Sequence, residues 1–302
     1  MKIEHILAGF VPGGRGQDGL ALAVLLARRA GARLTVAHVH VPTWPTPGPG
    51  KIDAEWRAYV AAQAQTVLEQ ARELLAGVRD VPVDFVSHGH RGSGRGLVQL
   101  AGRLEADAVV IGPAPGGGKG RIRVGSTADQ LLHTSPVPVA LAPRGYAESH
   151  PPALRRLTVA YRRDPASDEA VRQAFELAGR MDVPLRLVTL VLGGGRRGGV
   201  EAEMLARIRE KVTADLDEIV RGHDDVRVDV EVLEGRDVAA ALAGTDCEGA
   251  MLICASSETG PLRRVFPGDV SLKIIRSAPC PVMMVPRSPA GKRGSAGRRG
   301  KR

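Results

Sequence analysis

Residues 124–144 read VGSTADQLLHTSPVPVALAPR, and residues 267–287 read PGDVSLKIIRSAPCPVMMVPR. The two stretches match at a constant offset along the chain. The matched pairs are Gly125 with Gly268, Leu131 with Ile274, Pro136 with Pro279, Pro138 with Pro281 and Arg144 with Arg287. An internal repeat of this length indicates a duplicated domain, and the residues that differ between the copies indicate which copy kept its chemistry.

Around the repeat, short apolar runs alternate with helical patterns, which predicts an α/β fold of parallel sheets covered by helices. The 302 residues suffice for two such domains. We expect these domains at residues 1–145 and 154–287. In the first half the sequence predicts strands at 3–10, 33–39, 81–87, 108–112 and 137–142, and helices at 19–30, 54–75, 96–104 and 127–134. In the second half it predicts strands at 156–161, 185–191, 226–233, 249–255 and 282–285, and helices at 168–180, 201–221, 237–243 and 270–277.

The net charge of +9 is concentrated at the end of the chain. Residues 288–302, SPAGKRGSAGRRGKR, contain six lysines and arginines and no large apolar residue, so we expect a disordered basic tail. The rest of the chain carries only a small positive charge, and no aromatic residues are interleaved with the basic ones. The sequence therefore gives no indication of a specific nucleic-acid partner.

The chain has neither a membrane-length apolar run nor the apolar region of a signal peptide, so we expect a cytoplasmic protein without a membrane partner. Its three cysteines, Cys247, Cys254 and Cys280, lack CxxC spacing. This pattern indicates neither a disulfide framework nor a zinc site. The apolar surroundings of Cys254 and Cys280 predict core packing.

The loop that leads into the first copy of the repeat carries a chemical signal. It runs from Gly112 through Pro115 to Gly125-Ser126-Thr127, where the last helix of the first half is expected to begin. Free N–H groups at a helix N-terminus favour an anion such as phosphate, and the two hydroxyls could donate further hydrogen bonds. Ser126 or Thr127 would equally serve as an ordinary helix N-cap. Spacing alone leaves both interpretations open.

Both halves of the chain, over about residues 1 to 287, resemble the universal stress protein family in its tandem two-domain form. Nucleotide-binding members of that family carry the pattern Gly-x2-Gly-x9-Gly-[Ser/Thr] in this loop. Gly112 matches the first glycine, Gly125 the third and Ser126 the hydroxyl, and Pro136-Val137-Pro138-Val139 matches the entry to the fifth strand. The runs Ile6–Phe10 and Val39–Val41 are similar to the first and second strands of the family.

The resemblance implies two Rossmann-like domains of the adenine nucleotide alpha hydrolase-like type. Each is expected to hold a five-stranded parallel sheet of order 3-2-1-4-5 flanked by helices. The two copies are expected to pack as an intramolecular pseudo-dimer in which their fifth strands meet. The resemblance also implies ATP, with Mg²⁺, as the ligand. The candidate binding residues are Gly112, Gly125, Ser126, Thr127, Val11 and Val39.

The chain departs from the family pattern in both copies. In the first, Pro115 stands at the second glycine, where it removes an N–H, and Val11 stands where the family has an acid that contacts the nucleoside. Asp18 lies nearby but on the following helix, and we do not assign it that role. In the second copy the two glycines, the hydroxyl and the acid are replaced by Ala255, Glu258, Asp269 and Arg162. We therefore expect weak nucleotide binding in the first domain and a degenerate site in the second.

Other candidate sites receive less support from the sequence. The pairs His38-x-His40 and His88-x-His90 have ring nitrogens suited to zinc or copper, but no carboxylate or thiol completes a site, and we expect no bound metal. No Ser–His–Asp, paired-carboxylate or Cys–His constellation indicates catalysis. We expect a non-enzymatic stress-response regulator with unknown protein partners that can also form a homodimer. The alternatives are a ligand-free protein-interaction module of the same fold and, with less support, a nucleotide-cleaving enzyme.

Overall fold

A computed structural model describes residues 1–42, 52–149, 153–162, 164–193, 199–221, 226–257, 265 and 268–286. The expected basic tail at 288–302 and the substituted position Glu258 lie outside the described residues. None of the helices in the described part of the chain is both long and apolar enough to cross a membrane.

The first half contains β1 (His5–Gly9), α1 (Gly14–Ala30), β2 (Arg33–His40), α2 (Ile52–Leu74), β3 (Val83–Gly89), α3 (Ser93–Arg103), β4 (Ala108–Ile111), α4 (Ser126–Thr134) and β5 (Val139–Leu141). The second half contains β6 (Arg156–Ala160), α5 (Pro165–Met181), β7 (Leu185–Leu192), α6 (Gly199–Val220), β8 (Val228–Gly235), α7 (Val238–Ala243), β9 (Ala250–Ala255), α8 (Asp269–Ser277) and β10 (Val282–Val285). The predicted alternation of strands and helices, and with it the α/β fold class, is confirmed in both halves.

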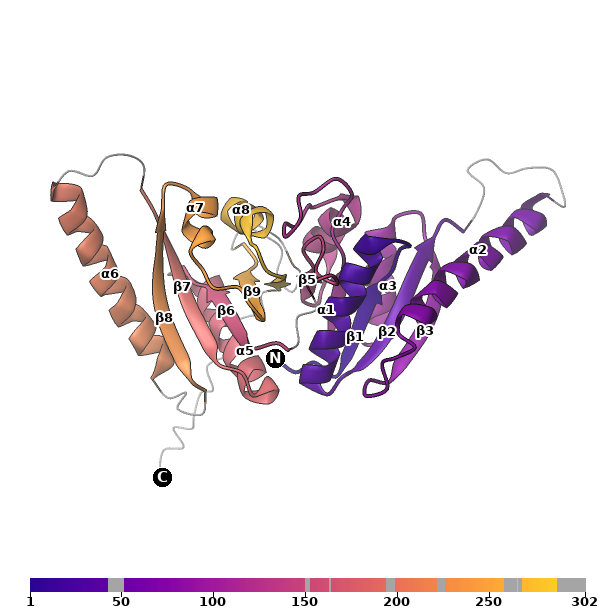
Figure 1. The fold of residues 1–302 in the computed structure, drawn as a ribbon, viewed down its shortest axis with the longest axis horizontal. Helices are drawn as coiled ribbons and strands as arrows, with labels where there is room; N and C mark the ends of the chain where they lie inside the picture. The colour runs from indigo at the N-terminus through magenta and orange to yellow at the C-terminus, as the bar shows by residue number, and fades with distance from the viewer. Residues whose placement is uncertain are drawn as a thin grey trace, which may run out of the picture.

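The strands of both halves join in one sheet of order β3-β2-β1-β4-β5-β10-β9-β6-β7-β8 (Figure 1). Neighbouring strands are parallel within each half, and the order there is the one that the family resemblance implies. At the centre β5 and β10 pair antiparallel, with Leu141 opposite Val282, Ala140 opposite Met283 and Val139 opposite Met284. We call this β5–β10 pairing the seam, because it unites the two halves.

Helices cover both faces of the sheet, and on each face the apolar core crosses the seam. One core contains buried side chains of α1, α2 and α5 together with Ala140 of β5 and Met283 of β10. The other contains side chains of α3, α4, α7 and α8 together with Leu141 of β5 and Met284 of β10. The two halves therefore share their cores as well as their sheet.

The predicted start of the first helix at residue 19 is wrong, because α1 begins at Gly14. The glycines there resemble a loop in sequence, but close packing requires them. A Cβ on Gly16 would lie 1.9 Å from the carbonyl oxygen of Val11, and a Cβ on Gly19 would lie 2.7 Å from the backbone nitrogen of Gly112. The corresponding helix α5 also begins earlier than predicted, at Pro165, where the Asp164 carboxylate accepts a hydrogen bond from the Ser167 N–H.

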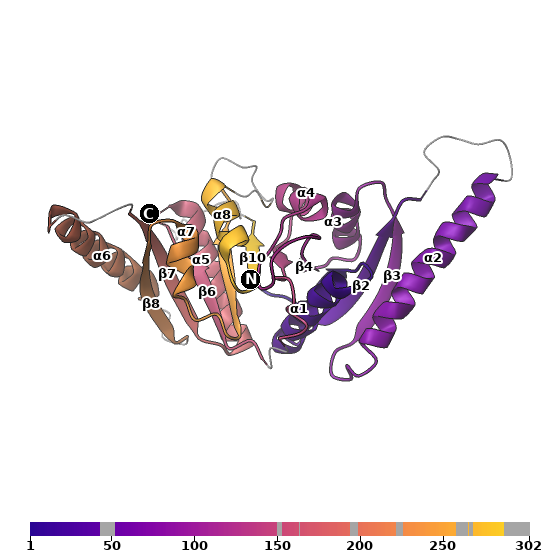
Figure 2. The same ribbon diagram turned by 45° about the horizontal axis from the view of Figure 1, so that its top comes forward.

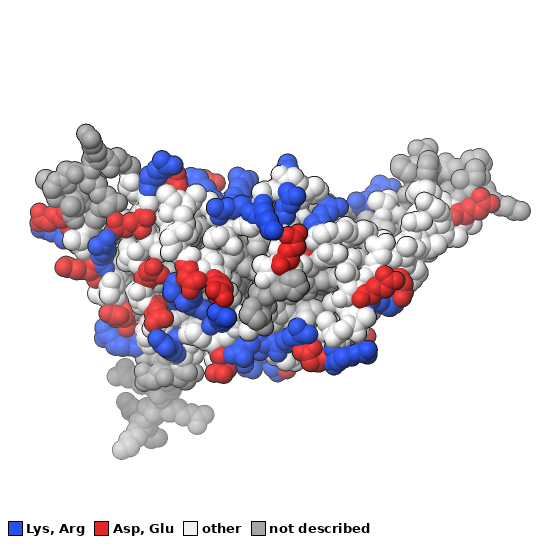
Figure 3. Space-filling model, in the orientation of Figure 1, with Lys and Arg blue, Asp and Glu red and all other residues white. Residues whose placement is uncertain are grey.

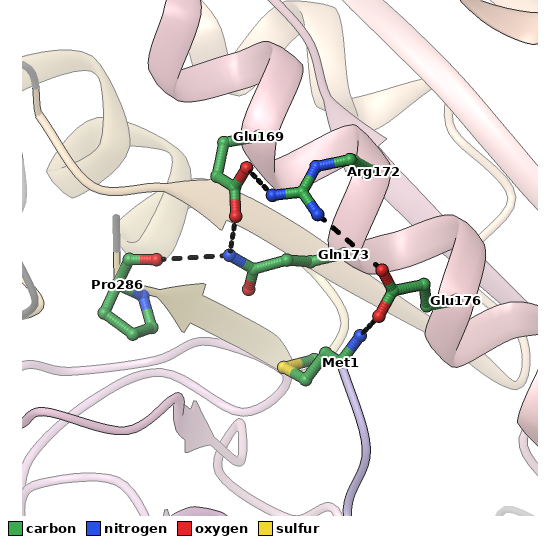
Figure 4. Close-up of polar contacts among 6 residues, drawn as sticks. All are labelled: Met1, Glu169, Arg172, Gln173, Glu176 and Pro286. Carbon is green, nitrogen blue, oxygen red and sulfur yellow. Dashed lines mark hydrogen bonds and ion pairs between the residues drawn. The ribbon is translucent and has the colours of Figure 1, made fainter. Parts of the chain in front are cut away.

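The N-terminus of the chain contacts the second half (Figure 4). The ammonium group of Met1 forms an ion pair with Glu176 on α5, and this hydrogen bond lowers the pKa of the Glu176 carboxyl. On the same helix, Gln173 donates to Glu169 at 2.7 Å and to the carbonyl of Pro286, just after β10, at 3.5 Å. Glu176 is half exposed, so this pair contributes little to stability.

Asp18 on α1 has a structural role. It is only 3% exposed, and its two carboxylate oxygens accept hydrogen bonds from the backbone N–H groups of Gly145 and Ala147, both at 2.9 Å. Those residues follow β5, so Asp18 fixes the start of the connection between the halves. Its side chain is committed to this turn.

Replacing Met283 by alanine should lower the free energy of unfolding by about 2–5 kcal/mol, because it opens a cavity where both halves share a core. Met204→Ala is the matched control. Met204 is 61% exposed on α6, so its truncation should change the free energy of unfolding by less than about 0.5 kcal/mol. Urea titration followed by circular dichroism measures both, and equal effects would contradict a shared core at the seam.

Asp18→Ala should lower the free energy of unfolding by about 2–4 kcal/mol, because it leaves two backbone N–H groups without their acceptor. The exposed Asp129 on α4 provides the control, and Asp129→Ala should stay within about 0.5 kcal/mol of wild type. The same urea titration applies. A loss at Asp18 no larger than that at Asp129 would show that the turn after β5 does not depend on the carboxylate.

Candidate ligand-binding site

A cavity lies at the carboxyl ends of the strands in the first half. β1 lies between β2 and β4, so successive connections leave β1 in opposite directions, and parallel sheets bind ligands at such a switch point. The cavity measures about 310 Å³, near the lower end of the range for small-molecule sites. All six candidate residues line it: Val11, Val39, Gly112, Gly125, Ser126 and Thr127.

Two of these residues are glycines for reasons of packing. A Cβ on Gly112 would lie 1.8 Å from the carbonyl oxygen of Arg15, and a Cβ on Gly125 would lie 2.6 Å from the Cβ of Ala114. Gly112 thus allows the first turn of α1 to rest on the end of β4. Gly125 allows the loop after β4 to pass the start of α4. Larger residues at either position would push these elements apart and change the shape of the cavity.

The start of α4 provides the polar end of the cavity. Gly125 occupies the N-cap position of this helix, so neither Ser126 nor Thr127 acts as the N-cap. The hydroxyls of Thr127 and Ser93, on α3, lie 2.5 Å apart, whereas Ser126 is exposed. The backbone N–H groups of the first turn face the same cavity and favour a negative charge.

The apolar end of the cavity comes from the other elements. Its walls include the apolar residues Phe10, Ala37, Val39, Leu97, Ile111 and Ala128. Sequence reasoning missed most of these residues, and it also missed Arg15 and Ser93. Arg15 belongs to the glycine-rich segment after β1, whose exposed side chains lie beside the loop after β4. The cavity therefore joins an apolar wall to a polar end at which Arg15 contributes a basic side chain.

Basic side chains fix the loop between β4 and α4. Arg123 donates to the carbonyl of Pro115 at 2.7 Å, Arg144 donates to the carbonyl of Gly117, and Arg121 crosses the seam to the carbonyl of Ser277. Lys119 pairs with Glu148 at 2.7 Å and lowers the pKa of that carboxyl. Lys and Arg side chains gather near the seam on the face shown in Figure 3. These basic side chains shape the loop.

The structure places the two histidine pairs on neighbouring strands, β2 and β3. Among the described residues, no group of three or more His, Cys, Asp or Glu side chains is placed to hold a metal ion. The rings of His38 and His40 stack 6.4 Å apart, as do those of His88 and His90. Val39 pairs with His88 in the sheet, so the two stacks lie on opposite faces. Burial lowers the pKa of His38.

A second cavity, of about 430 Å³, occupies the corresponding place in the second half. Ala255, Arg162 and Asp269 line it, at positions where the family pattern has a glycine, an acid and a hydroxyl. Arg162 pairs at 2.6 Å with Asp164, the N-cap of α5. Asp269 places a carboxylate in the first turn of α8. The second half keeps a cavity at this place, but the charged residues that line it differ from those of the first cavity. Figures 1 and 2 show α4 and α8 on either side of the seam.

The sequence profile of the Universal stress protein family matches residues 2–143 and 153–286. Universal stress proteins of Mycobacterium tuberculosis and Mycobacterium bovis are each 35% identical to this chain over 292 residues, which covers 93% of this chain and 99% of the relative. The crystal structure of a universal stress protein from Archaeoglobus fulgidus has the same fold, with a TM-score of 0.64, 16% identity, and coverage of 94% of this chain and 98% of that chain. The chain belongs to the universal stress protein family, with two tandem domains.

Proposed function

We propose that the first domain binds ATP weakly, together with Mg²⁺, and that the protein is a cytoplasmic, non-enzymatic regulator of a stress response. The observation that carries the proposal is the convergence of Gly112, Gly125, Ser126 and Thr127 on one cavity. Phosphates would contact the N–H groups at the start of α4 and the Ser126 hydroxyl. The base would lie against the apolar wall near Val39 and Leu97.

Two features of this cavity argue for low affinity. Pro115 has no N–H to donate to a phosphate, and Arg123 already occupies its carbonyl oxygen. Val11 offers no carboxylate to the ribose hydroxyls, which would leave these hydroxyls dependent on water or backbone groups. Mg²⁺ would have to be held chiefly by the phosphates and water, because it prefers oxygen ligands and none of the described residues that line the cavity is an aspartate or glutamate.

We assign the second domain a different role. Asp269 places negative charge at the second cavity, where Arg162 is already paired with Asp164, and the Asp269 carboxylate would repel a polyphosphate. The second domain would then contribute structure and surface for protein partners, whether in the monomer or in a homodimer. A ligand-free interaction module remains the alternative for the whole chain, favoured by Pro115 and Val11.

Isothermal titration with ATP and Mg²⁺ should give saturable binding with one site per chain. Ser126→Ala should weaken it roughly tenfold, because a hydrogen bond to a charged phosphate contributes about 1.5–3 kcal/mol. Ser271→Ala, in the second cavity, is the matched control and should leave the affinity unchanged. Absence of heat at millimolar nucleotide would favour the interaction module. ATP turnover that disappears with Ser126→Ala would favour an enzyme.

Pro115→Gly should raise the affinity for ATP several-fold, because it restores one N–H donor worth about 0.5–1.5 kcal/mol beside the phosphates. Pro115→Ala restores the same N–H without the extra flexibility of glycine. Equal gains in both variants would assign the effect to the donor, and a gain in the glycine variant alone would assign it to loop flexibility. Unchanged affinity in both would contradict this account of the loop.

A further inference from the structure

Two cysteines of the second half, Cys247 and Cys280, lie against each other at the amino ends of β9 and β10. These strands are parallel neighbours, with Val282 opposite Leu252. Cys280 lies two residues before the start of β10, and the N–H of Ala250 donates to the carbonyl of Cys247 at 3.1 Å, which turns Cys247 back toward the strand ends. Cys280 is a buried member of the apolar core on one face of the sheet and Cys247 packs against that core, which brings the two thiols within hydrogen-bonding reach of each other.

The two thiols differ in accessibility. Cys280 is only 5% exposed, whereas Cys247 is half-buried and so can meet a small reagent from solvent. The third cysteine, Cys254, is 1% exposed within β9. A partly exposed thiol beside a buried one is suited to reversible oxidation. A reagent oxidises the accessible sulfur, and the second sulfur then forms a disulfide with it.

Charged groups around Cys247 favour its thiolate. The hydrogen bond from Cys280 lowers the pKa of Cys247, and the guanidinium groups of Arg156 and Arg186 act in the same direction, against burial and the charge of Asp246. Arg156 is itself held by Asp246 at 2.7 Å, which fixes its place beside the thiol. Interaction with Cys247 and burial raise the pKa of Cys280, which favours the protonated form of this thiol. The thiolate is the nucleophilic form of cysteine.

We propose that Cys247 and Cys280 form a reversible dithiol–disulfide site that reacts with hydrogen peroxide. The Cys247 thiolate attacks one peroxide oxygen, the O–O bond breaks, and the departing hydroxide takes up a proton to leave as water. The sulfur of Cys280 then attacks the Cys247 sulfenic acid. The S–S bond forms, and the hydroxyl leaves as a second water with the proton of Cys280. The two sulfurs together supply the two electrons that reduce one peroxide.

The disulfide would act on the seam. Cys280 lies two residues before Val282, which pairs with Leu141 of the first half. A covalent link to Cys247 would tie the loop before β9 to the start of the strand that joins the halves. Reduction by a thiol would release it. The site depends on the second half alone, and its operation does not require that the first cavity bind nucleotide.

The test uses the full chain in its folded state, treated with hydrogen peroxide at neutral pH and then with an alkylating reagent. Intact mass should fall by about 2 Da on oxidation, since two hydrogens are lost. Peptide mass spectrometry should find Cys247 joined to Cys280 and Cys254 still reduced, and dithiothreitol should reverse the link. Cys254→Ala is the matched control and should form the link at the same rate within about twofold.

Three results would overturn the proposal. The first is oxidation of Cys247 to sulfinic acid without a disulfide. The second is a disulfide that joins two chains. The third is a folded protein in which both thiols stay unmodified although the urea-unfolded protein reacts. The Cys247→Ser variant should keep Cys280 reduced under the same treatment, and its circular dichroism spectrum checks that it folds. The wild-type peptide map decides the question by itself if that variant does not fold.

Discussion

The antiparallel pairing of β5 with β10 is the constraint on which the arrangement of this molecule depends. Each of these strands is only three or four residues long, and alone each would leave an unpaired sheet edge exposed to water or to other chains. Pairing satisfies both edges at once and places Met283 and Met284 in opposite cores. It also fixes α4 and α8, and thus both cavities, with respect to one another. A chain with two separate sheets would have to protect two edges independently.

The glycines of the first cavity serve packing as well as the binding that we propose. Gly112 and Gly125 are the motif glycines that the family resemblance identifies, yet their environment excludes a Cβ even without a ligand. The packing around the cavity requires glycine at these two positions, so the glycines alone are weak evidence for a bound ligand. The hydroxyl of Ser126, which is exposed and has no comparable packing role, is the more informative position. The second half keeps a cavity although Asp269 has replaced the hydroxyl, and there a Cβ on Gly268 would make an ordinary contact of 3.4 Å with the Cβ of Ser257.

The two copies have diverged mainly in charge and chemistry, and little in fold. At the acid position the second copy has Arg162 paired with Asp164, and all three cysteines are in the second half. At the amino ends of the central strands, the first half has a buried His5–Thr35 hydrogen bond of 2.8 Å, whereas the second has Arg156 and Arg186 with acidic partners. These residues lie near the ends of the strands. They can therefore differ between the copies while the packing of the apolar central strands stays the same.

The sequence by itself determined the duplication and the order of strands and helices, because repeats and periodicity are local properties of the chain. The glycine and hydroxyl positions of the first cavity followed from the resemblance to the family. The sequence pattern misplaced the start of α1, since glycines required by close contact resemble those of a loop. Only the tertiary structure decided that Arg15 and Ser93 join the cavity, that Asp18 holds the turn after β5, and that Cys247 meets Cys280. Each of these contacts joins residues that are distant in sequence, and only the folded sheet, through its strand register, brings them together.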